Sequence, residues 1–123
     1  MITIEAPIKV ISEANQRNHW AERKRRFDGQ RIELNYYWKQ SLKGRRVSLP
    51  CVVRLTRIGP KALDTDNLAG AFKAVRDQIA KEIGIDDGAV KQIRFEYAQE
   101  AIGSRKYGIR IEVVEQAEME VAA

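Results

Sequence analysis

An apolar stripe along residues 67–83 constrains the fold more than any other feature of this sequence. At 100° per residue, its five large apolar side chains fall within about 80° of arc, so the pattern predicts a helix with one buried face. Gly84 follows directly, in the position of a C-terminal glycine cap. Such a helix must pack its stripe against a second layer of structure. The stripe consists of Leu68, Phe72, Val75, Ile79 and Ile83.

Strand-like segments on both sides of this helix supply the second layer. Apolar residues at even positions near the N-terminus predict a strand with one buried face, which Pro7 interrupts at an edge or a bulge. β-branched runs predict three further strands. Residues 102–105 join the last two and look like a hairpin loop. The expected strands span about residues 2–10, 47–58, 90–99 and 105–114.

Residues from about 16 to 43 are expected to form a second helix. Asp28-Gly29 is a turn signal inside this segment, so the alternatives are one helix, or an ordered arm followed by a helix from about residue 30. The element order is then β, α, β, α, β, β. This predicts an α/β (α+β) domain, in which a small mixed sheet of about four strands is covered by two helices. The apolar stripe of this second helix consists of Trp20, Phe27, Leu34 and Trp38.

Composition limits the class of protein. With 44% hydrophobic and 32% charged residues, we expect one packed domain over residues 1–123, with about the last eight residues, from Gln116, frayed. Cys51 is the only cysteine, which excludes an internal disulfide and a zinc site of several cysteines, and favours a reducing cytoplasm. No apolar stretch approaches the roughly 20 residues of a membrane span, and the N-terminus lacks a secretory signal pattern. We therefore expect no membrane partner and no organic cofactor.

The single histidine and its neighbour are candidates for a direct role. His19 is the only histidine, so any histidine-dependent catalysis would depend on it. Trp20 could stack on a nucleic-acid base. Its position on the apolar stripe favours instead a core aromatic, and His19 beside it is then a helix-start residue.

Positive charge is concentrated in one segment. The net charge of the chain is +5, yet residues 17–46 carry ten basic and three acidic residues, and the remainder is slightly acidic. A basic block suits a polyanion, because each neutralised phosphate releases condensed counterions. The alternative is a solvated helix face rich in arginine. The candidate DNA-binding residues are Arg17, Arg23, Lys24, Arg25, Arg26 and Arg31.

Two acidic pairs carry the densest chemistry. Asp64 and Asp66 stand where a loop enters the expected helix, and Asp86 and Asp87 stand in the turn that follows it. Four carboxylates form a hard, oxygen-rich ligand set of the kind that Mg²⁺ or Mn²⁺ prefers. Each pair also has a structural reading, as a helix N-cap and as an Asp-Gly turn. Convergence of the two pairs is an inference that the spacing alone does not establish.

The face of the expected helix opposite its apolar stripe supports the functional reading. Asp66 and Lys73 are seven residues apart, so on one straight helix they are nearly in line. Gly70 lies between them, where glycine costs roughly 1 kcal/mol relative to alanine. It either clears space on the aspartate face or permits close packing of another helix.

The segment Asp64-Thr65-Asp66-Asn67-Leu68, followed by Lys73, Asp77 and Ile85-Asp86-Asp87, resembles the RusA family of Holliday junction resolvases. The resemblance covers about residues 64–90 and is looser over the basic segment. It implies a homodimer that cuts four-way DNA junctions with Mg²⁺, in recombination and repair. The metal would be held by Asp64, Asp66 and Asp87, together with Asp86. The family's helical lysine lies one turn earlier, where this chain has Gly70, and Lys73 is the candidate substitute.

Two other classes of protein remain open. The first is a non-catalytic module that binds junction or duplex DNA, with an acidic cluster that serves only the structure. The second is an assembly factor whose basic arm contacts RNA or an acidic protein. Cleavage that depends on a divalent metal separates the first from a nuclease, and salt-sensitive DNA binding counts against the second.

Overall fold

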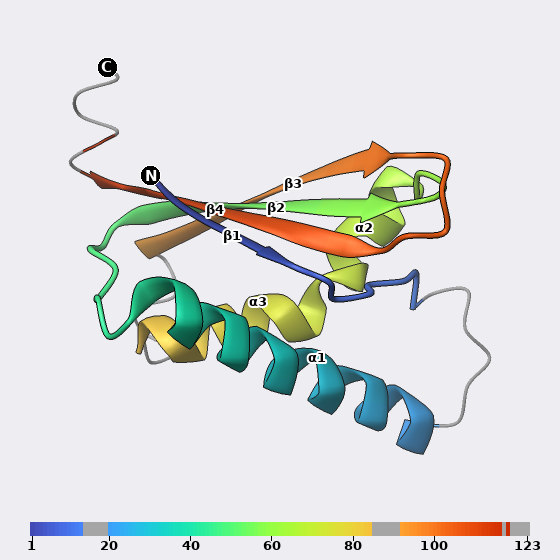
Figure 1. The fold of residues 1–123 in the computed structure, drawn as a ribbon, viewed down its shortest axis with the longest axis horizontal. Helices are drawn as coiled ribbons and strands as arrows, with labels where there is room; N and C mark the ends of the chain where they lie inside the picture. The colour runs from blue at the N-terminus through green and yellow to red at the C-terminus, as the bar shows by residue number, and fades with distance from the viewer. Residues whose placement is uncertain (14–19, 85–91, 117, 119–123) are drawn as a thin grey trace.

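The structure is a computed structural model that describes residues 1–13, 20–84, 92–116 and 118 (Figure 1). These residues form a four-stranded mixed sheet and three helices, which confirms the predicted mixed α and β class. No described helix is both long and apolar enough to cross a membrane. The elements are β1 (Ile2–Ala6), α1 (Trp20–Leu42), β2 (Cys51–Gly59), α2 (Thr65–Ala71), α3 (Lys73–Ile83), β3 (Ile93–Ala101) and β4 (Gly108–Glu115).

The strand order is β1-β4-β2-β3, with β2 parallel to β3 and the other neighbours antiparallel. The expected hairpin between β3 and β4 is therefore wrong, because β2 lies between those two strands. The chain that leaves β3 crosses the end of β2 instead, where the Ile102 N–H donates to the Gly59 carbonyl at 2.9 Å. The turn residues at 102–105 show where the chain reverses direction, but they do not determine which strand becomes the neighbour.

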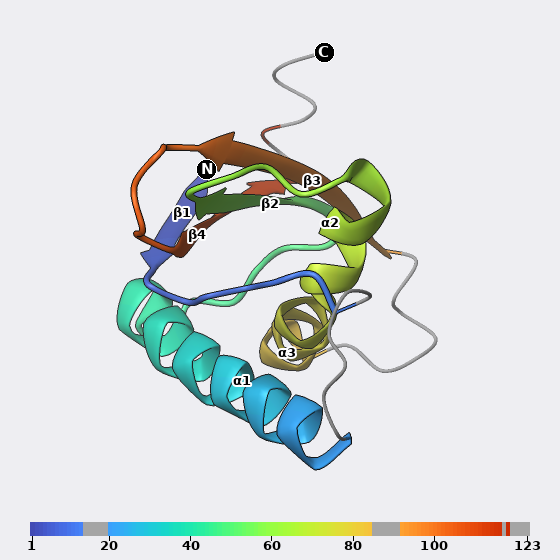
Figure 2. The same cartoon turned by 90° about the vertical axis from the view of Figure 1, so that its right-hand side faces the viewer.

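Both long helices cover one face of the sheet (Figures 1 and 2). α1 packs against α3 and β1, and α2 lies beside β3. The alternation that predicted the strands matches the burial of their side chains, and Cys51 is a buried member of the same core. Burial raises the pKa of its thiol to about 11. The centre of the core comprises Ile4, Val53, Leu55, Ile111 and Val113 from the sheet and Leu34, Phe72, Val75 and Ile79 from the helices.

β1 is an edge strand and is shorter than expected. It ends at Ala6, and the exposed Pro7 follows, since proline has no N–H to continue the ladder. Ile8 and Val10 remain buried beyond the end of the strand, so the period-two burial persists without strand pairing. The predicted alternation was therefore correct for burial and too long for the strand.

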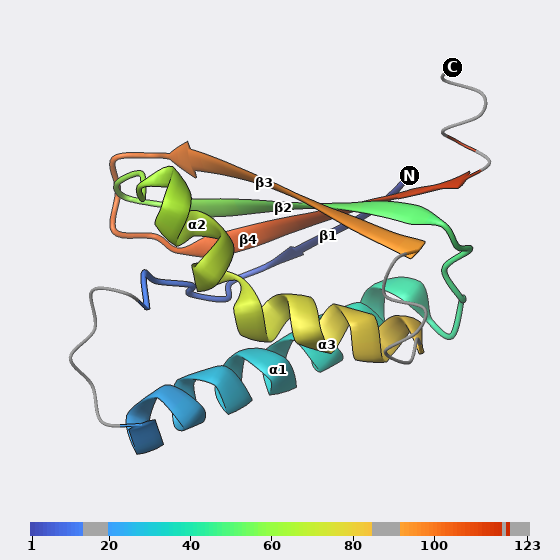
Figure 3. The ribbon, with the colours of Figure 1, turned by 180° about the vertical axis from the view of Figure 1, so that it is seen from behind.

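α1 is one continuous helix through Asp28 and Gly29, so the turn signal does not break it. A side chain at Gly29 would meet nothing within 4 Å. The expectation that Trp20 is a core aromatic is wrong, because it is 71% exposed. α1 diverges from the sheet toward its N-terminus (Figures 1 and 3), so the buried stripe begins only at Gln30 and continues through Leu34 and Trp38.

The expected single helix over residues 67–83 is two helices that meet at Phe72. The backbone of Phe72 has φ −91° and ψ 6°, and the helix direction changes there (Figure 3). Phe72 is fully buried against the sheet side of the core, which gives the break a packing reason. The apolar stripe itself is confirmed, since Leu68, Val75 and Ile79 are buried. Gly84 ends α3 with φ 83°, as the cap pattern predicted.

Most of the expected frayed end lies outside the described residues. Of its described residues, Glu118 accepts a hydrogen bond from the N–H of Glu115, the last residue of β4, at 3.4 Å. The Glu118 carboxylate also lies 2.5 Å from the amino group of Met1. The start of this segment is therefore attached to the sheet.

Two glycine substitutions should change stability in opposite directions. Gly29→Ala is expected to stabilise the protein by about 0.5–1 kcal/mol, because alanine is the better helix former and open space surrounds the site. Gly84→Ala should destabilise it by about 1 kcal/mol, because φ is +83° there. Urea unfolding followed by circular dichroism measures both. A loss of stability in Gly29→Ala would mean that the chain turns at residues 28–29.

Candidate metal and nucleic-acid site

The acidic pair follows the C-terminal end of β2. Asp64 is the N-cap residue of α2, with φ −60° and ψ 146°, and its carbonyl accepts hydrogen bonds from the N–H groups of Asn67 (2.9 Å) and Leu68 (3.1 Å). Its side chain makes no cap hydrogen bond. The helix start is thus satisfied by the backbone of Asp64, and the structural reading does not account for its carboxylate.

The residue before Asp64 is held by β3. Gln99 accepts a hydrogen bond from the Leu63 N–H and donates one to the Leu63 carbonyl, both at 2.8 Å. The side-chain amide therefore binds both backbone groups of Leu63 and ties the loop to the sheet. Sequence reasoning missed Gln99, because nothing in the local pattern of β3 distinguishes this amide from a surface residue. Its two bonds fix the backbone directly before Asp64.

The carboxylates of Asp64 and Asp66 are available for a ligand. Both residues are exposed, and neither makes an ion pair or a side-chain hydrogen bond with any residue that the structure describes. Mg²⁺ is typically bound through one or two carboxylates, with waters and substrate phosphates completing its shell. The donor set of this pair therefore fits a magnesium ion that also contacts a phosphate.

The second acidic pair, Asp86 and Asp87, lies outside the described residues, as do Arg17 and His19. Among the residues that are described, no group of three metal-ligating side chains forms. Ile93, which follows the undescribed segment, pairs with Cys51 at the start of β2, whereas Asp64 follows the end of β2. Convergence of the two acidic pairs stays a prediction.

Lys73 does not have the environment that a straight helix would give it. It is the first residue of α3, after the break, so the alignment with Asp66 on one helix is wrong. Its ammonium group donates to Asp77 at 3.0 Å, and Arg31 contacts the same carboxylate oxygen at 3.4 Å. Gly70 is exposed, and a Cβ added there would meet nothing within 4 Å, so close packing of another helix does not explain this glycine. A catalytic role for Lys73 stays a prediction without the support of that alignment.

The basic block on α1 is partly neutralised by internal ion pairs. Glu13 contacts both Arg26 and, at 3.8 Å, Arg23. Lys24 pairs with Asp28 at 2.8 Å. Arg25 and Lys39 are exposed basic residues of α1 that form no ion pair with a carboxylate in the described part of the chain. The charge that α1 offers to a polyanion is therefore smaller than the count of basic residues predicts.

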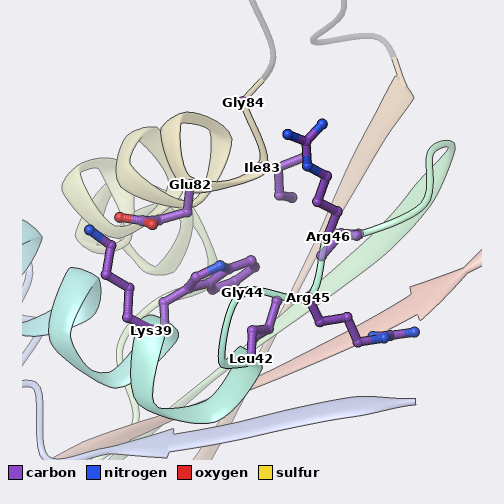
Figure 4. Close-up of a pocket in the computed structure, with 10 residues that line it drawn as sticks. Lys39, Leu42, Gly44, Arg45, Arg46, Glu82, Ile83 and Gly84 are labelled. Atoms are coloured by element: carbon purple, nitrogen blue, oxygen red, sulfur yellow. The ribbon is translucent and has the colours of Figure 1, made fainter.

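A second basic group lines a pocket of about 430 Å³ between the C-terminal ends of α1 and α3 (Figure 4). Lys39 and Glu82 point toward one another across it, and Arg45 points away from it. Arg45 forms an ion pair with Glu115, which also accepts the Ser48 N–H at 2.7 Å. Arg45 is thereby held by the fold, and Lys39 and Arg46 are the lining cations that form no ion pair with a described residue.

Comparison of the chain with protein-family models, with curated proteins and with solved structures found no match. The geometry of the residues and the pattern of the sequence are therefore what support a function. At the junction between β2 and α2, two exposed carboxylates lie next to a backbone segment that Gln99 holds by two hydrogen bonds.

Glu115 should make the stability depend on pH. The Ser48 N–H, above all, and Arg45 hold the pKa of this carboxyl below its ordinary value, against the effect of burial. The stabilisation is therefore complete above the unfolded-state pKa of about 4.3 and is lost as the pH falls through the lower folded-state pKa. Glu115→Gln should cost about 1–3 kcal/mol at pH 7 and progressively less toward pH 3. Urea unfolding of both proteins across this range measures the difference, and an equal loss at every pH would contradict the assignment.

Proposed function

We propose that this chain is a Mg²⁺-dependent, structure-specific DNA endonuclease that resolves four-way (Holliday) junctions by hydrolysing phosphodiester bonds. The observation that carries the proposal is the exposed pair Asp64 and Asp66, which the fold holds at the β2–α2 junction without using their carboxylates. The resemblance of residues 64–90 to the RusA family supports the choice of substrate. Mn²⁺ has similar ligand chemistry and would be expected to substitute.

In this proposal, the acidic residues bind the metal and Gln99 keeps Asp64 in position. Asp64 and Asp66 hold the cation, and Asp86 and Asp87 add ligands if the two pairs converge. A bound Mg²⁺ lowers the pKa of a coordinated water and offsets charge on the leaving oxygen. Gln99 keeps Leu63, and hence Asp64, in place through the two hydrogen bonds described above. Preorganisation of this kind is needed because small displacements of a reacting group reduce the rate strongly.

A junction substrate also requires two cuts. A two-fold homodimer would present two such sites to strands of similar polarity, which suits the symmetry of a four-way junction. Arg25, together with the paired residues Arg23, Lys24, Arg26 and Arg31, would contact the DNA backbone and position it without reading sequence.

A non-catalytic DNA-binding module is the second candidate. One observation favours it. Lys73, the candidate catalytic lysine, is already paired with Asp77 at 3.0 Å. In that case the chain would bind branched or duplex DNA equally well with and without a divalent metal.

The decisive test is cleavage of an end-labelled four-way junction and a matched linear duplex, with Mg²⁺ or with EDTA. Wild type is expected to nick the junction symmetrically and only with Mg²⁺. Asp66→Asn should reduce the rate by roughly 100-fold or more, because several kcal/mol of metal-based stabilisation are lost and about 1.4 kcal/mol corresponds to a factor of ten.

Glu33→Gln is the matched control, since Glu33 is an exposed helical carboxylate on α1 without a partner among the described residues. It should cleave like wild type, and both variants should unfold at the wild-type temperature. Equal digestion of junction and duplex would contradict the structure specificity. A junction that is bound but never cut, with several divalent metals, would overturn the nuclease and favour the binding module.

A further inference from the structure

A second concave site lies directly before the acidic pair in the chain. It is a pocket of about 640 Å³, formed by the segment after β1, the end of β2 and the loop that precedes β4. Four of its lining residues are cationic, and no carboxylate lines it in the described structure. A concave surface of a single sign of charge raises the local concentration of the opposite ion. The residues that matter for the argument are Lys9, Arg57, Lys61, Leu63, Arg105 and Tyr107.

Arg57 is the unusual member of this group. It is a charged residue on a central strand, and it is only 4% exposed. No carboxylate of the described residues forms an ion pair with it. Its Nε donates to the Val10 carbonyl at 3.1 Å and its Nη1 to the Lys61 carbonyl at 2.8 Å. A guanidinium group has five N–H donors, so these two bonds leave three without a described protein acceptor. A buried charge without a counter-charge is costly, which calls for an explanation beyond packing.

The surroundings of Arg57 hold its planar group in place. A Cβ at Gly59 would lie 3.0 Å from three atoms of the guanidinium, so the absence of a side chain there leaves room for it. Its central carbon is 5.8 Å from the centre of the Tyr107 ring, and the Lys9 ammonium is 4.4 Å from the same centre. Two cations are thus gathered around one aromatic ring. Burial lowers the pKa of Arg57, but an arginine remains charged at neutral pH.

The position of the pocket relates it to the acidic pair. Lys61 and Leu63 line the pocket, and Asp64 follows Leu63 directly. Consecutive Cα atoms are about 3.8 Å apart, so a ligand in the pocket lies next to the start of α2. An arginine fork with free donors, supported by an ammonium group, matches the oxygens of a phosphate. Inside a nuclease, such a site would hold the polynucleotide while a neighbouring phosphodiester is hydrolysed.

We propose that this pocket, which we call the Arg57 pocket, binds one phosphate group of the DNA backbone beside the bond that is cut. The identity of the DNA as a cleavage substrate rests on the function proposed above, whereas the phosphate chemistry of the pocket does not. The same oxygens occur in inorganic phosphate and in the terminal phosphate of a free nucleotide. The contacts favour a backbone phosphate, because the pocket is continuous in the chain with the acidic pair and lies at the surface.

The test measures junction binding in EDTA, so that no cleavage is required. Lys9→Gln should weaken binding about tenfold and reduce the slope of log affinity against log salt by about one phosphate contact. Arg57→Lys keeps the charge but removes the planar fork, so it should weaken binding about tenfold with little change in that slope. Lys81→Gln removes one exposed positive charge on α3 outside the pocket and serves as the matched control. Its effect on the slope should be clearly smaller. Lys9 is exposed, so that variant remains informative if Arg57→Lys does not fold.

Substitution of single backbone phosphates by neutral methylphosphonates identifies the source of the phosphate. At one position near the cut, this substitution should weaken DNA binding by the wild-type protein about tenfold. It should leave the affinity of Lys9→Gln unchanged, since that variant has already lost the contact. If no position behaves in this way, or if Lys9→Gln and Lys81→Gln have equal slopes, the inference is overturned. Stronger competition by inorganic phosphate or by a mononucleotide, with no position-specific effect, would also overturn the backbone assignment. If these binding results hold but the protein never cleaves DNA, the proposed nuclease activity is refuted and the phosphate site is retained.

Discussion

The parallel pairing of β2 with β3 is the constraint on which the rest of the structure depends. Parallel neighbours cannot be joined by a tight turn, so the chain must return along the sheet before β3 begins. α2 and α3 make this return, and their apolar stripe covers the sheet together with the buried side of α1. The same connection places Asp64 and Asp66 just after the carboxyl end of β2, where the backbone is held by the last strand residues and by Gln99.

Arg57 and the acidic pair have opposite relations to the protein interior. The carboxylates are exposed and are not used by the fold, so a ligand can approach them at little cost in desolvation. The guanidinium is already desolvated, and its electric field is therefore less screened than that of a surface arginine. A basic residue of this kind can contribute more to the recognition of an anion than the basic residues of α1, of which Arg23 and Arg26 are paired with Glu13 and Lys24 with Asp28.

Much of the fold could be predicted because burial follows local periodicity. The alternation in β1 and the stripe ending at Gly84 were sufficient to locate strands and a helix terminus. Strand neighbours, the break at Phe72 and the exposure of Trp20 could not be predicted, because each depends on how separate elements pack. The acidic pair was identified from residue type and its place at a helix start. Arg57 was not, since in sequence it resembles any charged residue at the end of a strand, and only the packed structure shows that no carboxylate approaches it among the described residues.

The shortness of β1 has a consequence for how this molecule behaves in concentrated solution. β1 lies at the edge of the sheet, where a bare row of backbone donors and acceptors can recruit a strand from another molecule. Only five residues form that edge, and Pro7 ends it with a position that has no hydrogen to donate. A strand from another molecule could form only a few backbone hydrogen bonds with this edge. This edge of the sheet is therefore a poor template for open-ended, fibre-like stacking.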